Sequence, residues 1–206
     1  MDYNLDLFRG VHACRLCKLS EFRLEGGYLP TPALPGALYQ EGGLALLCEA
    51  PGADEERVGE PLVGRAGKLT DQLLKAAGLG REQVLLLNRI RCRPPGNRIK
   101  DWPEAIANCD PWTAQELRVY NPSVVLLMGA TAISSVFGAK ALVTQTRGSF
   151  LAKDDRHEWG QRVYGASFHP AAILRNGGIG SDLYNQVLKD IVAAKAVMEE
   201  LTHGVQ

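Results

Sequence analysis

The chain lacks the features that mark membrane proteins, secreted proteins and strongly charged proteins. No stretch is long and apolar enough to span a membrane, and the N-terminus lacks the basic and then apolar layout of a signal peptide. An excess of charge of one sign is also missing, because 23 Lys and Arg residues balance 23 Asp and Glu residues. We therefore expect a cytoplasmic protein without a membrane partner, in which any contact with a polyanion must come from a local basic patch.

Internal repeats and low-complexity tracts are absent too, and 206 residues fit a single domain with a sizeable core. Short apolar runs without alternation predict buried parallel strands at 44–50, 84–90, 123–130 and 163–168. Helical spacing between the runs predicts helices at 67–77, 102–120, 129–137 and 182–201. This alternation predicts an α/β fold, a three-layer α/β/α sandwich with a mainly parallel central sheet of about four strands, over residues 1–206.

Polar motifs follow three of the predicted strands. Glu49-Ala-Pro-Gly52 follows the first strand, Asn88 ends the second, and His169 ends the last. Ligands bind beyond the carboxyl ends of such strands, so we expect one active site at this edge. Each motif also has an ordinary explanation, namely a turn between strand and helix, a strand-end cap and a structural histidine.

The three motifs offer complementary chemistry. Glu49 can hold or polarise a water molecule, and Asn88 pairs a donor with an acceptor, as the amide edge of a pyrimidine does. His169 can donate a hydrogen bond to a developing anion. Their placement at equivalent strand ends favours an active site.

Four of the five cysteines form a pattern, a local pair and two distant residues: Cys14, Cys17, Cys92 and Cys109. Structural disulfides are rare in the cytoplasm, and four thiolates suit a tetrahedral zinc ion or an iron–sulfur cluster. The alternative is a set of scattered core thiols. The fifth cysteine, Cys48, lies in an apolar run and is not a ligand candidate.

A basic segment surrounds one of these cysteines and contains Arg89, Arg91, Arg93, Arg98 and Lys100. The segment predicts either a local DNA-binding patch or a solvated basic loop.

In combination, these motifs resemble family 4 of the uracil-DNA glycosylase superfamily, whose members carry an iron–sulfur cluster. The resemblance covers nearly the whole chain and is carried by the order of the cysteines and by four motifs: Glu49-Ala-Pro-Gly52, Pro61-Leu-Val-Gly-Arg-Ala-Gly67, the run from Asn88 to Asn97, and His169-Pro170. It implies a DNA repair enzyme that flips uracil out of double- or single-stranded DNA and hydrolyses its N-glycosidic bond.

The resemblance also implies a role for each site residue. Glu49 and Glu55 would position water or stabilise the sugar cation, and His169 would stabilise the departing uracil. The uracil-binding residues would be Ala50, Leu62 and Asn88. Support of the DNA or of the loop would come from Arg91, Arg93, Asn97 and Arg175. A [4Fe–4S] cluster would be held by an N-terminal segment and two later residues: Cys14, Cys17, Cys92 and Cys109.

One departure from the family pattern affects the pocket, because Leu62 stands where the family usually has a phenylalanine that stacks on uracil. Other hypotheses are therefore a glycosylase for hypoxanthine or xanthine, a weakly active or inactive iron–sulfur DNA-binding module, and a zinc-stabilised nucleotide-binding protein. No lysine occupies a nucleophile position, which predicts a monofunctional enzyme. The region 143–148 lacks the histidine-bearing insertion of a covalent relative, which predicts turnover, and we expect a monomer.

Overall fold

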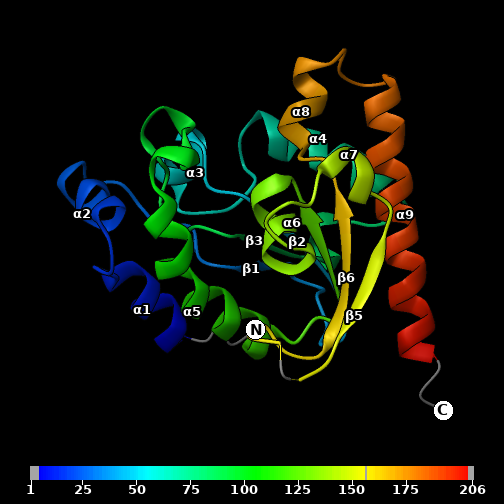
Figure 1. Ribbon diagram of the computed structural model, residues 1–206, viewed down its shortest axis with the longest axis horizontal. Coiled ribbons are helices and arrows are strands. Elements are labelled where there is room, and N and C mark those ends of the chain that lie inside the picture. The colour runs from blue at the N-terminus through cyan, green and yellow to red at the C-terminus, as the bar shows by residue number, and fades with distance from the viewer. Residues whose placement is uncertain (1–4, 156, 204–206) are drawn as a thin grey trace.

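A six-stranded sheet forms the centre of the computed structural model, which describes residues 5–155 and 157–203 (Figure 1). The strands follow the order β1-β3-β2-β4-β6-β5. Their bounds are β1 Leu34–Pro35, β2 Leu44–Cys48, β3 Leu85–Asn88, β4 Val124–Met128, β5 Phe150–Lys153 and β6 Arg162–Ser167. The four inner strands are parallel, and the two edge strands β1 and β5 are antiparallel to their neighbours.

The predicted α/β fold is confirmed, and the four predicted strands are the four parallel ones. All residues of β2, β3 and β4 are buried, as continuous apolar runs covered on both faces should be. The two edge strands were not predicted. One has only two residues and the other is half-exposed, so neither leaves an apolar run in the sequence.

Helices connect the strands and cover both faces of the sheet. Their bounds are α1 Leu5–Ala13, α2 Lys18–Glu25, α3 Ala53–Val58, α4 Arg65–Ala76, α5 Pro103–Tyr120, α6 Ala130–Phe137, α7 Val143–Thr146, α8 Pro170–Arg175 and α9 Asp182–His203. The four predicted helices correspond to α4, α5, α6 and α9. In the part of the chain that is described, no helix has both the length and the apolar character that crossing a membrane requires.

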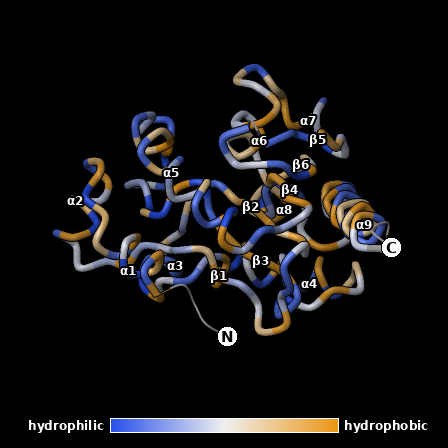
Figure 2. Tube along the Cα trace, turned by 90° about the horizontal axis from the view of Figure 1, so that it is seen from below, coloured by the Kyte–Doolittle hydropathy of each residue, from blue (hydrophilic) through white to orange (hydrophobic). Residues whose placement is uncertain are grey.

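Two apolar layers bind the helices to the sheet, which gives the predicted three-layer sandwich (Figure 2). Residues Leu46 and Leu126 face one layer, where they meet α4, α8 and α9. Their chain neighbours Leu47 and Leu127 face the other layer, with α5 and α6. Successive strand residues point to opposite faces, so each buried strand contributes to both layers.

A smaller third cluster joins the N-terminal helices to the rest of the molecule. Leu19 of α2 packs there with Ile90, with Ala105 of α5 and with two of the cysteines, Cys92 and Cys109. Helices α1 and α2 lie at one side of the sheet, next to α5 (Figure 1). This cluster places the N-terminal cysteine pair beside the segment that follows β3.

The strand order also creates a natural binding crevice. The chain leaves the central strand β2 for β3 on one side and later returns to β4 on the other side. At such a reversal the connecting helices diverge, and ligands bind at the carboxyl ends of the two strands. The loops after β2 and β4 are therefore expected to border the site.

Candidate active site

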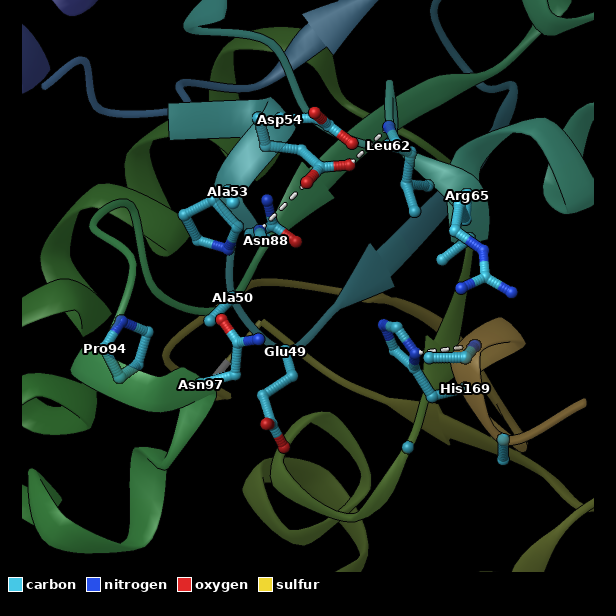
Figure 3. A pocket seen from close by; sticks show the side chains of 18 of the residues that line it. Glu49, Ala50, Ala53, Asp54, Leu62, Arg65, Asn88, Pro94, Asn97 and His169 are labelled. Carbon is cyan, nitrogen blue, oxygen red and sulfur yellow. Dashed lines mark hydrogen bonds between the residues drawn. The ribbon is translucent and has the colours of Figure 1, made fainter. Parts of the chain in front are cut away.

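A cavity of about 580 Å³ lies at the carboxyl ends of the parallel strands. Side chains from the ends of different strands line it, including Glu49, Asn88 and His169 (Figure 3). Leu62 and Arg65 lie on one side of this pocket, and Pro94 and Asn97 lie on the opposite side. The sequence motifs predicted to meet at this edge of the sheet do so.

Glu49 is held by a residue that the sequence motifs did not single out. The Thr131 hydroxyl, in the first turn of α6, donates a hydrogen bond to the Glu49 carboxylate. Glu49 is half-buried and follows β2 directly, so its carboxylate remains partly open to the pocket. The contact joins the β2 and β4 loops across the switch point of the sheet.

Asn88 lies at the floor of the pocket and is 2% exposed. Its Nδ2 donates to the hydroxyl of Thr31, 3.1 Å away, which is itself fully buried. A carboxamide has four hydrogen-bonding positions, so this contact leaves the others for a ligand. Asn88 can therefore present a donor and an acceptor side by side to a flat polar ring.

His169 precedes α8 and is fixed by its own helix. The backbone N–H of Ala171 donates to His169 Nδ1 at 3.1 Å, so Nδ1 acts as acceptor and Nε2 carries the hydrogen of the neutral ring. Burial, and to a lesser extent the charge of Arg175, lowers the pKa of His169 to about 4. The side chain is therefore a neutral hydrogen-bond donor at physiological pH.

Glu55, also expected at the reaction centre, binds backbone instead. Its Oε1 accepts hydrogen bonds from the N–H groups of Val63 and Gly64 at 3.0 and 2.8 Å. Its Oε2 accepts from the N–H of Gly52 at 3.0 Å, and the residue is 8% exposed. Both oxygens are thus engaged in joining the loop after β2 to the loop before α4, which leaves Glu49 as the freer carboxylate.

Leu62 lines the pocket and has an unusual backbone conformation. Its φ is +55°, a left-handed value that costs a branched residue about 1–2 kcal/mol. The side chain is 5% exposed and packs against the core layer of α4. Ala50, the other residue expected to contact uracil beside Asn88, lines the same cavity.

The residues expected to support the DNA or the loop divide into two groups. Arg91 is 2% exposed and pairs with buried Glu116, so it braces the loop from inside and does not reach the surface. Arg93 binds Asn97 Oδ1 through Nε and Glu56 through Nη1, both at 2.7 Å. Asn97 lines the pocket with this loop.

The basic segment as a whole is less exposed than its sequence suggests. Arg89 is also 2% exposed and pairs with Asp110, and only Arg98 and Lys100 of the five cations are exposed. Arg175, by contrast, is exposed at the pocket. The structure therefore moves the candidate phosphate contacts from the middle of the segment to its end and to the pocket rim.

The four cysteines of the predicted ligand set line a separate small cavity next to the third core cluster. Its walls include Cys14, Cys17, Cys92 and Cys109. Burial raises the pKa of Cys92 to about 12 and also raises the pKa of Cys109. Cys48 is buried elsewhere, in the core layer that α4, α8 and α9 form with the sheet.

The chemistry of this cavity fits a thiolate-bound group. Arg23 is 5% exposed and faces Cys92, and its Nε has no hydrogen-bond partner among the described residues. Trp112 Nε1 donates to Cys14 Sγ at 3.4 Å. Buried cationic and N–H donors directed at sulfur suit thiolates that carry negative charge. Within residues 5–155 and 157–203, no three His, Cys, Asp or Glu side chains already stand at metal-ligand spacing.

Two functional side chains were not predicted from the sequence: Thr131, which holds Glu49, and Arg65, which lines the pocket. Thr131 lies just after β4, the one parallel strand whose end was not searched for polar groups. Arg65 is exposed at the first position of α4 and lines the cavity. Applying the strand-end rule to every predicted strand would have found Thr131, whereas Arg65 lies within the quoted motif from Pro61 to Gly67 but was given no role there.

Comparison with known proteins gives consistent matches over most of the chain. Residues 37–192 match the family model described as the uracil DNA glycosylase superfamily. A type-4 uracil-DNA glycosylase of Thermotoga maritima is 38% identical over 155 residues, which are 74% of this chain and 76% of that protein. Type-4 uracil-DNA glycosylases of Archaeoglobus fulgidus and Sulfurisphaera tokodaii are each 34% identical, covering 82% and 81% of this chain and 82% and 73% of theirs.

Proposed function

This chain belongs to the uracil DNA glycosylase superfamily, and we propose that it is a DNA repair glycosylase that hydrolyses the N-glycosidic bond of uracil in DNA. The observation that carries the proposal is the meeting of Glu49, Asn88 and His169 in one pocket. These side chains supply a carboxylate, an amide and a neutral imidazole, the three groups that excision of a pyrimidine requires.

The base is recognised at the floor of the pocket after it flips out of the DNA. Asn88 binds the amide edge of uracil, and the buried Thr31 hydroxyl keeps its carboxamide in place. The backbone at Ala50 helps to bind a carbonyl of uracil, and Leu62 forms an apolar contact with the ring. Cytosine presents a different pattern of donors and acceptors on this edge, so the same contact discriminates against the normal base.

Bond cleavage leaves the electron pair of the N-glycosidic bond on the base and positive charge on the sugar. His169 donates a hydrogen bond from Nε2 to the developing uracil anion. A donor that is already neutral and fixed by Ala171 stabilises this charge without reorganisation, an effect typically worth 10²–10³ in kcat.

The sugar cation is stabilised from the opposite side by Glu49. Its carboxylate also accepts a proton from the water molecule whose oxygen bonds to the sugar, which yields an abasic site. The Thr131 hydroxyl orients the carboxylate for both tasks. None of the described residues that line the pocket is a lysine, in keeping with a monofunctional hydrolase.

A [4Fe–4S] cluster is the cofactor that the donor set fits. Cys14, Cys17, Cys92 and Cys109 would hold it, and it would supply structure to the molecule by joining the N-terminal segment, the segment after β3 and helix α5. Arg23 and Trp112 would donate to the sulfurs. The segment that contains Cys92 leads into the loop of Arg93 and Asn97, so a bound cluster would support one wall of the pocket.

DNA is the substrate and partner in this proposal, and exposed cations around the pocket serve its phosphates. Arg65 and Arg175 lie at the cavity itself, and Arg98 and Lys100 lie beyond the loop of Asn97. A few local cations suffice for a chain with no net charge.

A base panel tests the proposal directly. The purified, cluster-containing protein is incubated with end-labelled oligonucleotides that are identical except for one uracil, thymine, cytosine, hypoxanthine or xanthine, and abasic sites are then cleaved with alkali. We expect a cut band with uracil, in single and double strands. Faster cutting at hypoxanthine or xanthine would mean that this base, and not uracil, is the main substrate. No cutting at any base, with the visible absorbance of the cluster intact, would overturn the glycosylase proposal.

A further inference from the structure

The wall of the pocket that carries Leu62 is held by two charged side chains, Glu55, which also lines the pocket, and Arg81, which does not. We infer that Arg81 is a positioning residue that, together with Glu55, clamps residues 61–64 so that Leu62 faces the base. We call residues 61–64 the wall loop. This inference rests on the proposed function and adds to it a determinant of which bases fit.

The backbone of the wall loop needs such support. Among the described residues, Leu62, Asn97 and Asn121 are the non-glycine residues with positive φ. Asparagine adopts this conformation readily, but leucine does not. A strained conformation of this kind persists only where the surroundings enforce it, and such strain is concentrated at ligand sites.

Arg81 holds the carbonyl groups of the loop. Its Nη2 donates to the carbonyl of Pro61 and its Nη1 to the carbonyl of Leu62, both at 2.8 Å. The planar guanidinium presents these donors in a fixed fork, so it fixes the relative orientation of two successive peptide groups. Asp71 pairs with the same Nη1 at 3.0 Å and orients the fork from α4.

Glu55 holds the amide groups that follow. Its Oε1 accepts from the N–H groups of Val63 and Gly64, so the carbonyls of the first half of the loop and the amides of the second half are all bound by charged side chains. The loop therefore needs neither a regular strand nor a helix to satisfy its backbone.

Close packing removes the remaining freedom. A Cβ atom on Gly67 would lie 1.7 Å from the Leu62 carbonyl oxygen, so α4 passes directly beneath the wall loop. The Leu62 side chain itself is almost fully buried between the pocket and the core. The wall loop therefore cannot move away from a base that binds in the pocket.

The position of Arg81 links this wall to base recognition. Arg81 begins the 3₁₀ turn Arg81–Gln83, which leads into β3 and so to Asn88 at its end. One short segment therefore fixes both the side chain beside the base and the side chain that reads its edge. Loss of the Arg81 fork should loosen the wall while leaving Asn88 in its strand.

The test compares Arg81→Met, which removes the fork, with Asp71→Asn, which keeps the fork and weakens only its ion pair. Free uracil binding is measured by calorimetry, and kcat and KM are measured on a single-uracil oligonucleotide. For Arg81→Met we expect at least fivefold weaker uracil binding and at least tenfold lower kcat/KM, with binding to an abasic oligonucleotide within twofold. Asp71→Asn should stay within twofold throughout, and Arg81→Lys should recover part of the loss.

Hydrogen–deuterium exchange separates the clamp from the activity. Peptides that cover residues 61–68 should exchange at least tenfold faster in Arg81→Met than in Asp71→Asn, while peptides that cover β3 and β4 remain unchanged. Unchanged exchange in 61–68, or a lower melting temperature with unaltered uracil affinity, would overturn the clamp. If the wild type excises no uracil but local exchange responds as expected, then the proposed substrate fails and the clamp stands.

Discussion

The pocket and the cysteine cavity differ in how far protein groups already bind their buried polar side chains. In the pocket the functional side chains are already held: Glu55 by three backbone N–H groups, and His169 by Ala171. In the cysteine cavity Cys92 and Cys109 are buried, Arg23 Nε lacks a partner among the described residues, and Trp112 Nε1 donates a hydrogen bond to Cys14 Sγ.

This difference indicates which region depends on a cofactor. A preorganised pocket keeps its shape without ligand, because protein groups satisfy its buried atoms. A cavity lined by thiols and an arginine reaches its stable form when a cluster converts the thiols to bound thiolates. Cysteine changes should therefore affect folding most, and pocket changes should affect chemistry most.

Loss of a cluster ligand has the largest expected effect. Cys92→Ala should abolish the brown colour and the visible absorbance, because a structural metal centre contributes on the order of 10 kcal/mol to folding. Even half of that free energy corresponds to a fall of about 15 °C in the melting temperature of a chain of this size. Absorbance, iron content and calorimetric melting measure the outcome.

The chain offers a matched control in Cys48, which is fully buried in another part of the core. Cys48→Ala should keep the colour and cost about 1 kcal/mol of stability, as an ordinary core truncation does. Equal melting temperatures for Cys92→Ala and Cys48→Ala, with the colour kept in both, would mean that the cysteines are scattered core thiols.

Removal of the pocket imidazole comes next. His169→Gln should lower kcat on a uracil oligonucleotide by 10²–10³, about 3–4 kcal/mol of transition-state stabilisation, with little change in DNA affinity. His12→Gln is the control, because His12 is on α1, does not line the pocket, and its ring contacts the carbonyl and the ring of Phe8 on the same helix. Equal losses of catalysis and of DNA binding would make His169 a binding group.

The same variant tests the neutral state of His169 through the pH dependence of folding. The pKa is about 4 in the folded protein and near 6.5 in the unfolded chain, so the unfolded state gains a proton first on acidification. Stability is therefore complete above pH 6.5 and is lost as the pH falls towards 4, by up to about 3 kcal/mol. Denaturant titrations should show this loss in the wild type and a smaller loss in His169→Gln.

The sequence predicted the parts of the fold that are written in local patterns. The buried runs of β2, β3, β4 and β6 identified the parallel sheet, and the rule that ligands bind at strand ends brought Glu49, Asn88 and His169 together. Edge strands and the short helix α3 carry no such pattern, because they are half-exposed or only a turn and a half long.

Side-chain partners could not be read from the sequence, because they depend on which segments the fold brings together. Arg91 looked like a phosphate contact until Glu116, 25 residues away, was found beside it in the interior. Glu55 looked like an acid at the reaction centre, but its oxygens bind the backbone of the wall loop. The partners in both cases lie on separate elements, which a linear pattern of charges does not specify.

A phenylalanine at position 62 has the smallest expected effect and tests how finely the pocket is preorganised. Stacking on the base is worth about 1–3 kcal/mol, but the wall loop cannot move to accommodate a larger ring, and overpacking costs about 1–3 kcal/mol. Because residue 62 lines the pocket and also packs in the core, we expect Leu62→Phe to raise uracil kcat/KM by up to about tenfold and to lower stability by about 1 kcal/mol. Leu62→Met, which adds length without a flat face, should stay within threefold of the wild type. If Leu62→Phe and Leu62→Met behave alike, stacking does not limit this enzyme, and the rigid apolar wall is sufficient for the base that it binds.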